Sequence, residues 1–129
     1  MHIITCHDAY TLVNSSEHVL FIDVRTETEH HMVGHPVGCT LIPWQVEPLW
    51  GENRAFLPQV TALATSQEQP VVLICRTGQR AMQAGKSLEK NGFTNVYIVS
   101  AGFDGDLGEN GQRGTKNGWR FSRLPWEQL

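Results

Sequence analysis

The stretch VVLICRTGQRAMQAGKSLEK, Val71 to Lys90, joins an apolar run to an amphipathic one through a cysteine. The run Pro70–Ile74 is aliphatic, starts with proline and is too short for a helix, which predicts a central strand covered on both faces. A helix with one buried face is predicted next, because four small or apolar residues recur at i, i+3, i+4 and i+7. These residues are Ala81, Ala84, Gly85 and Leu88.

The same alternation continues on both sides of this stretch. Three further apolar runs predict strands: Val19–Val24, Thr40–Pro43 and Asn95–Val99. A helix is predicted to begin at Thr26, where Glu29 completes a capping box. A second helix is predicted around residues 53–66, with Asn91-Gly92 ending the helix described above. Strands alternating with helices predict an α/β domain with a mainly parallel sheet.

Length and composition exclude several classes of protein. The 129 residues suit one domain with a single core, and 40% hydrophobic with 18% charged residues is typical of a globular protein. A net charge of −3 gives no case for binding nucleic acid or a membrane surface. The first residues lack a basic, apolar leader, and we expect neither a signal peptide nor a membrane span.

The cysteine pattern favours a reducing compartment. Cys6, Cys39 and Cys75 are an odd number with no CxxC pair, which argues against a disulfide framework and a zinc site. The interpretation is a cytoplasmic protein with no metal and no cofactor. Cys6 and Cys39 are expected to be small buried hydrophobes rather than thiols that resolve an intermediate at Cys75.

The last segment differs from the rest of the chain. Residues 101–129 are rich in glycine and show no period of 2 or 3.6, so we expect no regular element there. The segment also carries Phe103, Trp119, Phe121 and Trp126, which a disordered tail rarely contains. Residues 1–129 are therefore predicted to form a single domain, with an α/β body over 1–100 and an irregular segment over 101–129 held to it by aromatics.

The joint CRTGQR, Cys75 to Arg80, is the candidate functional site. Ligand sites in parallel sheets lie at the carboxyl ends of strands, where loops lead into helix N-termini with unpaired N–H groups. Converging N–H groups form a nest for an anion, so Cys75 is expected to be held as a thiolate. Arg76 and Arg80 add positive charge, and Gly78 allows a backbone conformation that a side chain would obstruct. A phosphate cradle, a sulfur-handling nucleophile and a merely buried thiol all remain open.

Spacing separates the first two interpretations. Cysteine-dependent phosphatases use Cys-x5-Arg, a loop that wraps a tetrahedral phosphate. In this chain the position that follows Cys75 and five further residues is Ala81, where the phosphatase motif requires arginine. Arg80 lies one position before it. A ring of N–H groups smaller by one residue suits the outer sulfur of a persulfide better than a phosphoryl group.

Three motifs together resemble the single-domain rhodanese, thiosulfate sulfurtransferase-like family. FIDVRTETEHHMVGH (Phe21–His35) resembles its early signature, VVLICRTGQRA (Val71–Ala81) its six-residue active-site loop, and GFDGDL…GW…LPW the ending of some members. The resemblance implies a rhodanese-like three-layer α/β domain with a central, mainly parallel five-stranded sheet flanked by helices. Pro36 and Cys39 depart from it, since many members have an aliphatic residue and an alanine there. The stretch WQVEPLWGENRAFLP is longer than the minimal version and is expected to form one wall of the site.

The activity that the resemblance implies is a two-step sulfur transfer. Cys75 would attack the outer sulfur of a small anionic donor such as thiosulfate, and the resulting persulfide would pass to cyanide or a thiol acceptor, including a sulfur-carrier protein. Arg76, Thr77, Gly78, Gln79 and Arg80 would bind the substrate.

Residues outside the loop have expected roles that are largely structural. Asp23 is either a support of the site or a cap, and Arg25 is expected to form an ion pair with Asp23 or with a helix carboxylate. His30 and His31 are adjacent and cannot form an i, i+4 metal pair, and His35 is expected to be structural.

Three alternatives to an active sulfurtransferase stay open. They are a phosphatase or arsenate reductase on the same fold, a module that binds without catalysis, and a persulfide carrier that serves a protein partner.

Overall fold

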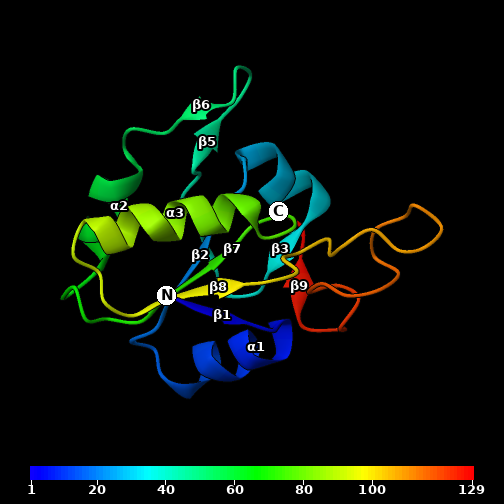
Figure 1. The fold of residues 1–129 in the computed structure, drawn as a ribbon, viewed down its shortest axis with the longest axis horizontal. Helices are drawn as coiled ribbons and strands as arrows, with labels where there is room; N and C mark the ends of the chain where they lie inside the picture. The colour runs from blue at the N-terminus through cyan, green and yellow to red at the C-terminus, as the bar shows by residue number, and fades with distance from the viewer.

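A five-stranded sheet forms the middle layer of the computed structural model, which describes all residues 1–129 (Figure 1). The strands lie in the order β1-β8-β7-β2-β4, and every neighbouring pair is parallel. Their bounds are His2–Ile4 for β1, Leu20–Asp23 for β2, Thr40–Leu41 for β4, Val71–Ile74 for β7 and Val96–Val99 for β8. The predicted α/β class and five-stranded sheet are confirmed, and the main sheet is parallel throughout.

Helices cover both faces of this sheet and complete three layers (Figure 1). Helix α1 (Cys6–Ser15) lies on one face, while α2 (Phe56–Leu63) and α3 (Gln79–Lys90) lie on the other. A short helix of π type, η1, spans Glu29–Val33 near the ends of β2 and β4. None of the helices has the length and apolar character needed to cross a membrane.

Strand β7 is central because its side chains serve both cores. Val71 and Leu73 pack in the core beneath α2 and α3, and Val72 and Ile74 pack in the core beneath α1. All four are fully buried, as the continuous apolar run predicted. The predicted face of α3 is confirmed as well, since Ala81, Ala84, Gly85 and Leu88 are its buried residues.

The start of the chain was not assigned from the sequence. It forms β1, which pairs with β8, and then α1, whose N-cap Thr5 accepts a hydrogen bond from the Asp8 N–H. The capping box at the next helix is confirmed: Thr26 N–H donates to Glu29 Oε1 at 3.2 Å, and Glu29 N–H donates to Thr26 Oγ1 at 3.3 Å.

Two short antiparallel pairs lie outside the main sheet. Strand β3 (His35–Pro36) pairs with β9 (Trp126–Glu127), which ties the end of the chain to the segment after η1. Strands β5 (Gln45–Val46) and β6 (Gly51–Glu52) form a hairpin beyond the helical layer (Figure 1).

The segment after β8 is held to the body by aromatic side chains, two of which are fully buried. Phe103 and Trp119 are buried at 0% and 1% exposure, whereas Phe121 and Trp126 are 48% and 42% exposed. Trp119 packs against Phe21 and Tyr10, and its indole N–H donates to the Pro125 carbonyl at 2.8 Å. Trp126 also contacts the body, since its ring packs against Gly34 and edge-on against Phe103 at 5.9 Å between centroids. The expectation that aromatics anchor the segment therefore fits Phe103, Trp119 and Trp126, whereas Phe121 is about half exposed.

Substitution of Trp119 by alanine tests the importance of this anchor. We expect Trp119→Ala to lower the free energy of unfolding by about 3–5 kcal/mol, because it opens a cavity in the core and removes one of the two hydrogen bonds that the Pro125 carbonyl accepts, the other coming from the Val37 N–H. Phe121→Ala is the matched control and should change stability by less than about 1 kcal/mol. Urea denaturation of the two variants measures the difference, and similar losses in both would contradict the assigned anchor.

Candidate active site

The loop of Cys75 leaves the central strand at the carboxyl edge of the sheet. Cys75 follows β7 directly and is 1% exposed, and α3 begins four residues later at Gln79. The backbone N–H of Gly78 donates to Cys75 Sγ at 3.0 Å. A donated N–H stabilises negative charge on sulfur, so the loop provides the kind of contact that a thiolate or persulfide needs.

Gly78 is the loop position that only glycine fits. Its φ is +111°, and an added Cβ would lie 2.6 Å from the Ser100 carbonyl oxygen. A side chain here would be strained in its backbone and would also collide with the strand end. The conformation of the Cys75–Arg80 loop thus depends on its close contact with the chain after β8.

The chain after β8 also fixes the loop through backbone hydrogen bonds. Phe103 N–H donates to the Cys75 carbonyl at 2.8 Å, and Asp104 N–H donates to the Arg76 carbonyl at 3.0 Å. Both bonds engage carbonyl groups of the loop and none of its N–H groups. The irregular segment over 101–129 therefore supports the candidate site from its first residues.

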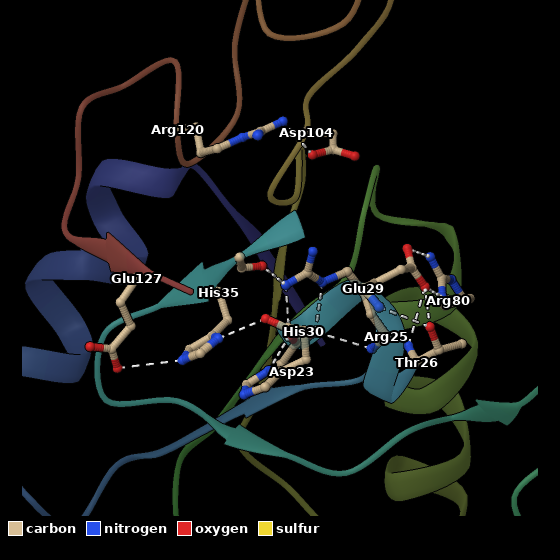
Figure 2. A network of polar contacts seen from close by, with 11 residues as sticks. Asp23, Arg25, Thr26, Glu29, His30, His35, Arg80, Asp104, Arg120 and Glu127 are labelled. Carbon is tan, nitrogen blue, oxygen red and sulfur yellow. Dashed lines mark hydrogen bonds and ion pairs between the residues drawn. The ribbon is translucent and has the colours of Figure 1, made fainter. Parts of the chain in front are cut away.

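The two loop arginines lie against carboxylates. Arg80 makes two hydrogen bonds with Glu29, at 2.6 and 2.9 Å (Figure 2). Arg76 Nε donates to Asp104 Oδ2 at 2.9 Å. Asp104 also accepts from Arg120 Nη2 at 2.9 Å. The sequence predicted both arginines as direct ligands of an anionic donor, and the structure places each of them in an ion pair.

A buried polar network lies beneath the loop at the end of β2 (Figure 2). Asp23 and Arg25 are fully buried and joined by two side-chain hydrogen bonds of 3.0 and 2.8 Å, which confirms the predicted ion pair. The same carboxylate also contacts His30, whose Nδ1 lies 2.8 Å from Asp23 Oδ2. The Arg25 guanidinium also lies over the Phe103 ring, 4.5 Å from its centroid.

His35 extends this network toward the end of the chain. Its ring stacks on that of His30 at 3.7 Å between centroids, its Nδ1 bonds the His30 carbonyl, and its Nε2 lies 3.4 Å from Glu127. His35 thus links η1 to β9. Its contacts agree with a structural role.

Glu29 and Asp23 remain ionised at neutral pH, because the pKa of each lies below its ordinary value. Burial raises the pKa of Glu29, but hydrogen bonds from Arg80 and Thr26 outweigh it, so the pKa lies below its ordinary value. Burial also raises the pKa of Asp23, but hydrogen bonds from His30 and Arg25 outweigh this effect, and the pKa of Asp23 lies below its ordinary value. For Arg80 burial lowers the pKa and the contact with Glu29 raises it, with a net increase.

The remaining loop residues border a groove. Thr77, Gly78 and Gln79 line a cavity of about 460 Å³ between α3 and strands β1 and β8. Cys75 itself does not line this groove, and the side chains of Thr77 and Gln79 give it neutral hydrogen-bonding groups.

The β5–β6 hairpin reaches the site from the other side. Arg80 Cζ lies 5.6 Å from the centre of the Trp50 ring, while Trp44 packs on Phe56 and donates to Gln83 Oε1 at 3.0 Å. The long stretch WQVEPLWGENRAFLP thus supplies Trp50 beside Arg80, as the sequence led us to expect of one wall of the site.

Three donor groups lie close enough to be considered as metal ligands. Asp23, His30 and Cys39 place one ligand atom each within 4.8 Å of the others. The Asp23 oxygens already accept from Arg25 and His30, and burial raises the pKa of the Cys39 thiol, which keeps it protonated. This donor set is poorly suited to a cation. Burial likewise raises the pKa of Cys6, to about 11.

Sequence reasoning missed three residues that shape the site. Glu29 was assigned only as a capping residue, and neither Asp104 nor His30 was assigned a role. Glu29 and Arg80 lie 51 positions apart, so no local pattern indicates their pairing. The signal available for Glu29 was its place in the motif DVRTETE, which the fold brings next to the Cys75 loop.

The chain belongs to the rhodanese-like domain family, whose model matches residues 5–108. The crystal structure of Rv0390 from M. tuberculosis is 30% identical and superposes with a TM-score of 0.87 over 100% of this chain and 98% of that one. The solution structure of the 30 kDa polysulfide-sulfur transferase homodimer from Wolinella succinogenes is 26% identical, with a TM-score of 0.68 over 100% of this chain and 80% of that one.

The similarity to sequence relatives also extends over most of both chains. An uncharacterized protein of Rickettsia conorii, RC0915, is 27% identical over 125 residues, which are 92% of this chain and 91% of the relative. The predicted family is therefore confirmed, and the chain is a rhodanese-like module.

Replacement of Gly78 tests the geometry of the loop. We expect Gly78→Ala to lower the free energy of unfolding by about 2–4 kcal/mol, because the new Cβ is strained and collides with Ser100. Gly111→Ala is the control: φ there is +76° but nothing lies within 4 Å, so only backbone strain of about 1 kcal/mol remains. Denaturant unfolding compares the two, and equal losses would disprove the steric contact with Ser100.

The ion pair of Glu29 makes a prediction about pH. Its folded pKa lies below the ordinary value of 4.5, so its contribution to stability is complete above that value and is lost as pH falls through the folded pKa. The stability difference between the wild type and Glu29→Gln should be constant above about pH 5 and shrink as the pH falls below it. Chemical denaturation from pH 3 to 8 measures this, and a difference that grew on acidification would have the wrong sign.

Proposed function

We propose that the protein is a sulfurtransferase that carries sulfane sulfur as a persulfide on Cys75. The observation that carries this proposal is the N–H of Gly78 donated to Cys75 Sγ within a six-residue loop at the end of the central strand. A nucleophile held this way needs no separate base, because the loop itself stabilises the charged sulfur.

The reaction would proceed in two displacements at sulfur. The Cys75 thiolate attacks the outer sulfur of thiosulfate, the S–S bond of the donor breaks, and sulfite leaves with the electron pair. A thiol or cyanide then attacks the outer sulfur of the Cys75 persulfide and regenerates the thiolate. Each step breaks one S–S bond and forms either another S–S bond or, with cyanide as acceptor, an S–C bond, so no external oxidant is needed.

The loop and its surroundings would divide the remaining tasks. Loop N–H groups hold the persulfide, Thr77 and Gln79 contact the donor from the groove, and Arg76 and Arg80 set the local charge. Asp23 and Arg25 would act as supports, since both lie buried beneath the loop and touch the segments that hold it. We further propose that residues 1–129 act as a single domain in a reducing, cytoplasmic setting, which the three free cysteines favour.

The similarity to the Wolinella succinogenes polysulfide-sulfur transferase supports the general chemistry. A carrier that receives sulfur on Cys75 and delivers it to a protein partner has the same first step and differs only in its acceptor. A phosphatase or arsenate reductase is disfavoured, because Ala81 occupies the position where the larger loop has its arginine.

Intact mass spectrometry after incubation with thiosulfate tests the proposal. We expect one added sulfur on the wild type and on Cys39→Ala, and none on Cys75→Ser. Thiocyanate formation from thiosulfate and cyanide should fall by at least about 10³-fold in Cys75→Ser, since the nucleophile is lost. Unchanged transfer by Cys75→Ser would refute the assignment, and hydrolysis of an aryl phosphate or reduction of arsenate would favour the alternative enzymes.

A further inference from the structure

Glu29 neutralises the arginine that closes the Cys75 loop. Its two oxygens bind Arg80 at 2.6 and 2.9 Å, and the two side chains are only 17% and 16% exposed (Figure 2). A bidentate pair of this kind fixes the orientation of the guanidinium as well as its charge. The positive charge of Arg80 is therefore already balanced by Glu29 before any substrate binds.

The other contacts of Arg80 and Glu29 hold this arrangement in place. Trp50 covers Arg80 from the hairpin, at 5.6 Å from Cζ to the ring centre. Glu29 also accepts from the Thr26 N–H and hydroxyl, so its carboxylate is fixed by its own helix as well as by Arg80. Rotation of Arg80 toward a substrate would leave Glu29 half-buried without its cation, which carries a substantial free-energy cost.

Arg76 carries a charge that is shared and partly solvated. Its side chain is 50% exposed, and its Nε donates to Asp104, which Arg120 also contacts. Two arginines and one carboxylate leave one positive charge in this group, spread over exposed side chains. Salt and water screen such a charge far more than a buried one.

The groove beside the loop carries no charge at all. Its lining is neutral and polar in Thr77, Gln79, Gln83 and Ser100, and apolar in Ile3, Met82 and Ile98, with Gly78 between them. A groove of this composition can accommodate an uncharged organic group, but it offers no positive charge to stabilise a second anionic group of a donor.

Charge separates the two classes of donor that the proposed function allows. Thiosulfate brings two negative charges to the site, whereas an organic persulfide anion or a thiosulfonate brings one and carries an organic group. A free Arg80 would attract a dianion about twice as strongly as a monoanion at the same distance, and the paired Glu29 cancels this attraction. We infer that Glu29 is a specificity-determining residue, positioned through Arg80, that directs the site toward monoanionic sulfane-sulfur donors with an uncharged organic body. This inference rests on the proposed function.

The transfer from such a donor is balanced without a further reactant. The Cys75 thiolate attacks the outer sulfur of the organic persulfide, its S–S bond breaks, and the organic thiolate leaves with the electron pair. With a thiosulfonate as donor the leaving group is a sulfinate, which carries one negative charge where sulfite carries two.

The test compares thiosulfate with benzenethiosulfonate as sulfur donors, with cyanide as acceptor. The measured quantity is the ratio of kcat/KM for thiosulfate to kcat/KM for benzenethiosulfonate, which is independent of the fraction of folded protein. We expect Glu29→Gln to raise this ratio about tenfold, because Arg80 keeps a hydrogen-bond partner but loses its counter-charge. Glu27→Gln is the matched control: it removes the same charge from an exposed residue two positions away and should change the ratio less than twofold.

The outcomes separate this inference from the proposed function. If neither donor leaves sulfur on Cys75, the proposed function fails and the inference falls with it. If both donors react but Glu29→Gln leaves the ratio unchanged, or Glu27→Gln shifts it equally, the inference alone is overturned. A wild-type KM that is no lower for benzenethiosulfonate than for methanethiosulfonate would overturn the assignment of the organic body to the groove.

Discussion

The ion pair of Asp23 and Arg25 connects the parts of the molecule that surround the Cys75 loop. Both side chains are fully buried, and each reaches a different segment: Asp23 contacts His30 on η1, while Arg25 donates to the Gly34 carbonyl and lies over Phe103. A buried pair costs desolvation and is strongly destabilising when one partner is removed, so its value here lies in fixing the relative positions of these segments. The sheet edge, η1 and the chain after β8 meet at this pair.

The loop is held on one side by this network and on the other by the strand end. Backbone bonds from Phe103 and Asp104 reach the carbonyls of Cys75 and Arg76, and the Ser100 carbonyl excludes any side chain at position 78. The chemistry of the loop therefore depends on residues that come after it in the sequence. Its N–H groups can point inward because other partners satisfy the carbonyls.

The elements predicted from the sequence are those specified by short-range patterns. Strand β7, helix α3 and the loop between them follow from an apolar run, a helical stripe and a glycine within twenty residues. Strand β1 was missed because its three residues carry too little pattern, and α1 was missed because only Cys6 and Ala9 are buried in it. The burial of Trp119 but not Trp126 could not be predicted either, since composition does not say which aromatic meets the core.

At the candidate site the sequence predicted the residue types and not their partners. Cys75, Gly78 and the two arginines follow from their spacing, but the carboxylates that pair with the arginines come from positions 29 and 104. Contacts across such separations are set by the order of strands in the sheet, which brings the ends of β2, β7 and β8 to one edge. Pairing of this kind becomes visible only once that order is known.

The burial of Cys75 has a consequence for the durability of the protein. Oxidation of a cysteine to sulfinic or sulfonic acid is irreversible, and its rate follows both thiolate character and exposure to solvent. Cys75 is only 1% exposed, so peroxide in bulk solution has little access to its sulfur atom. For the nucleophile proposed above, the loop would thus combine reactivity toward a bound donor with protection from oxidation, two properties that conflict in an exposed thiolate.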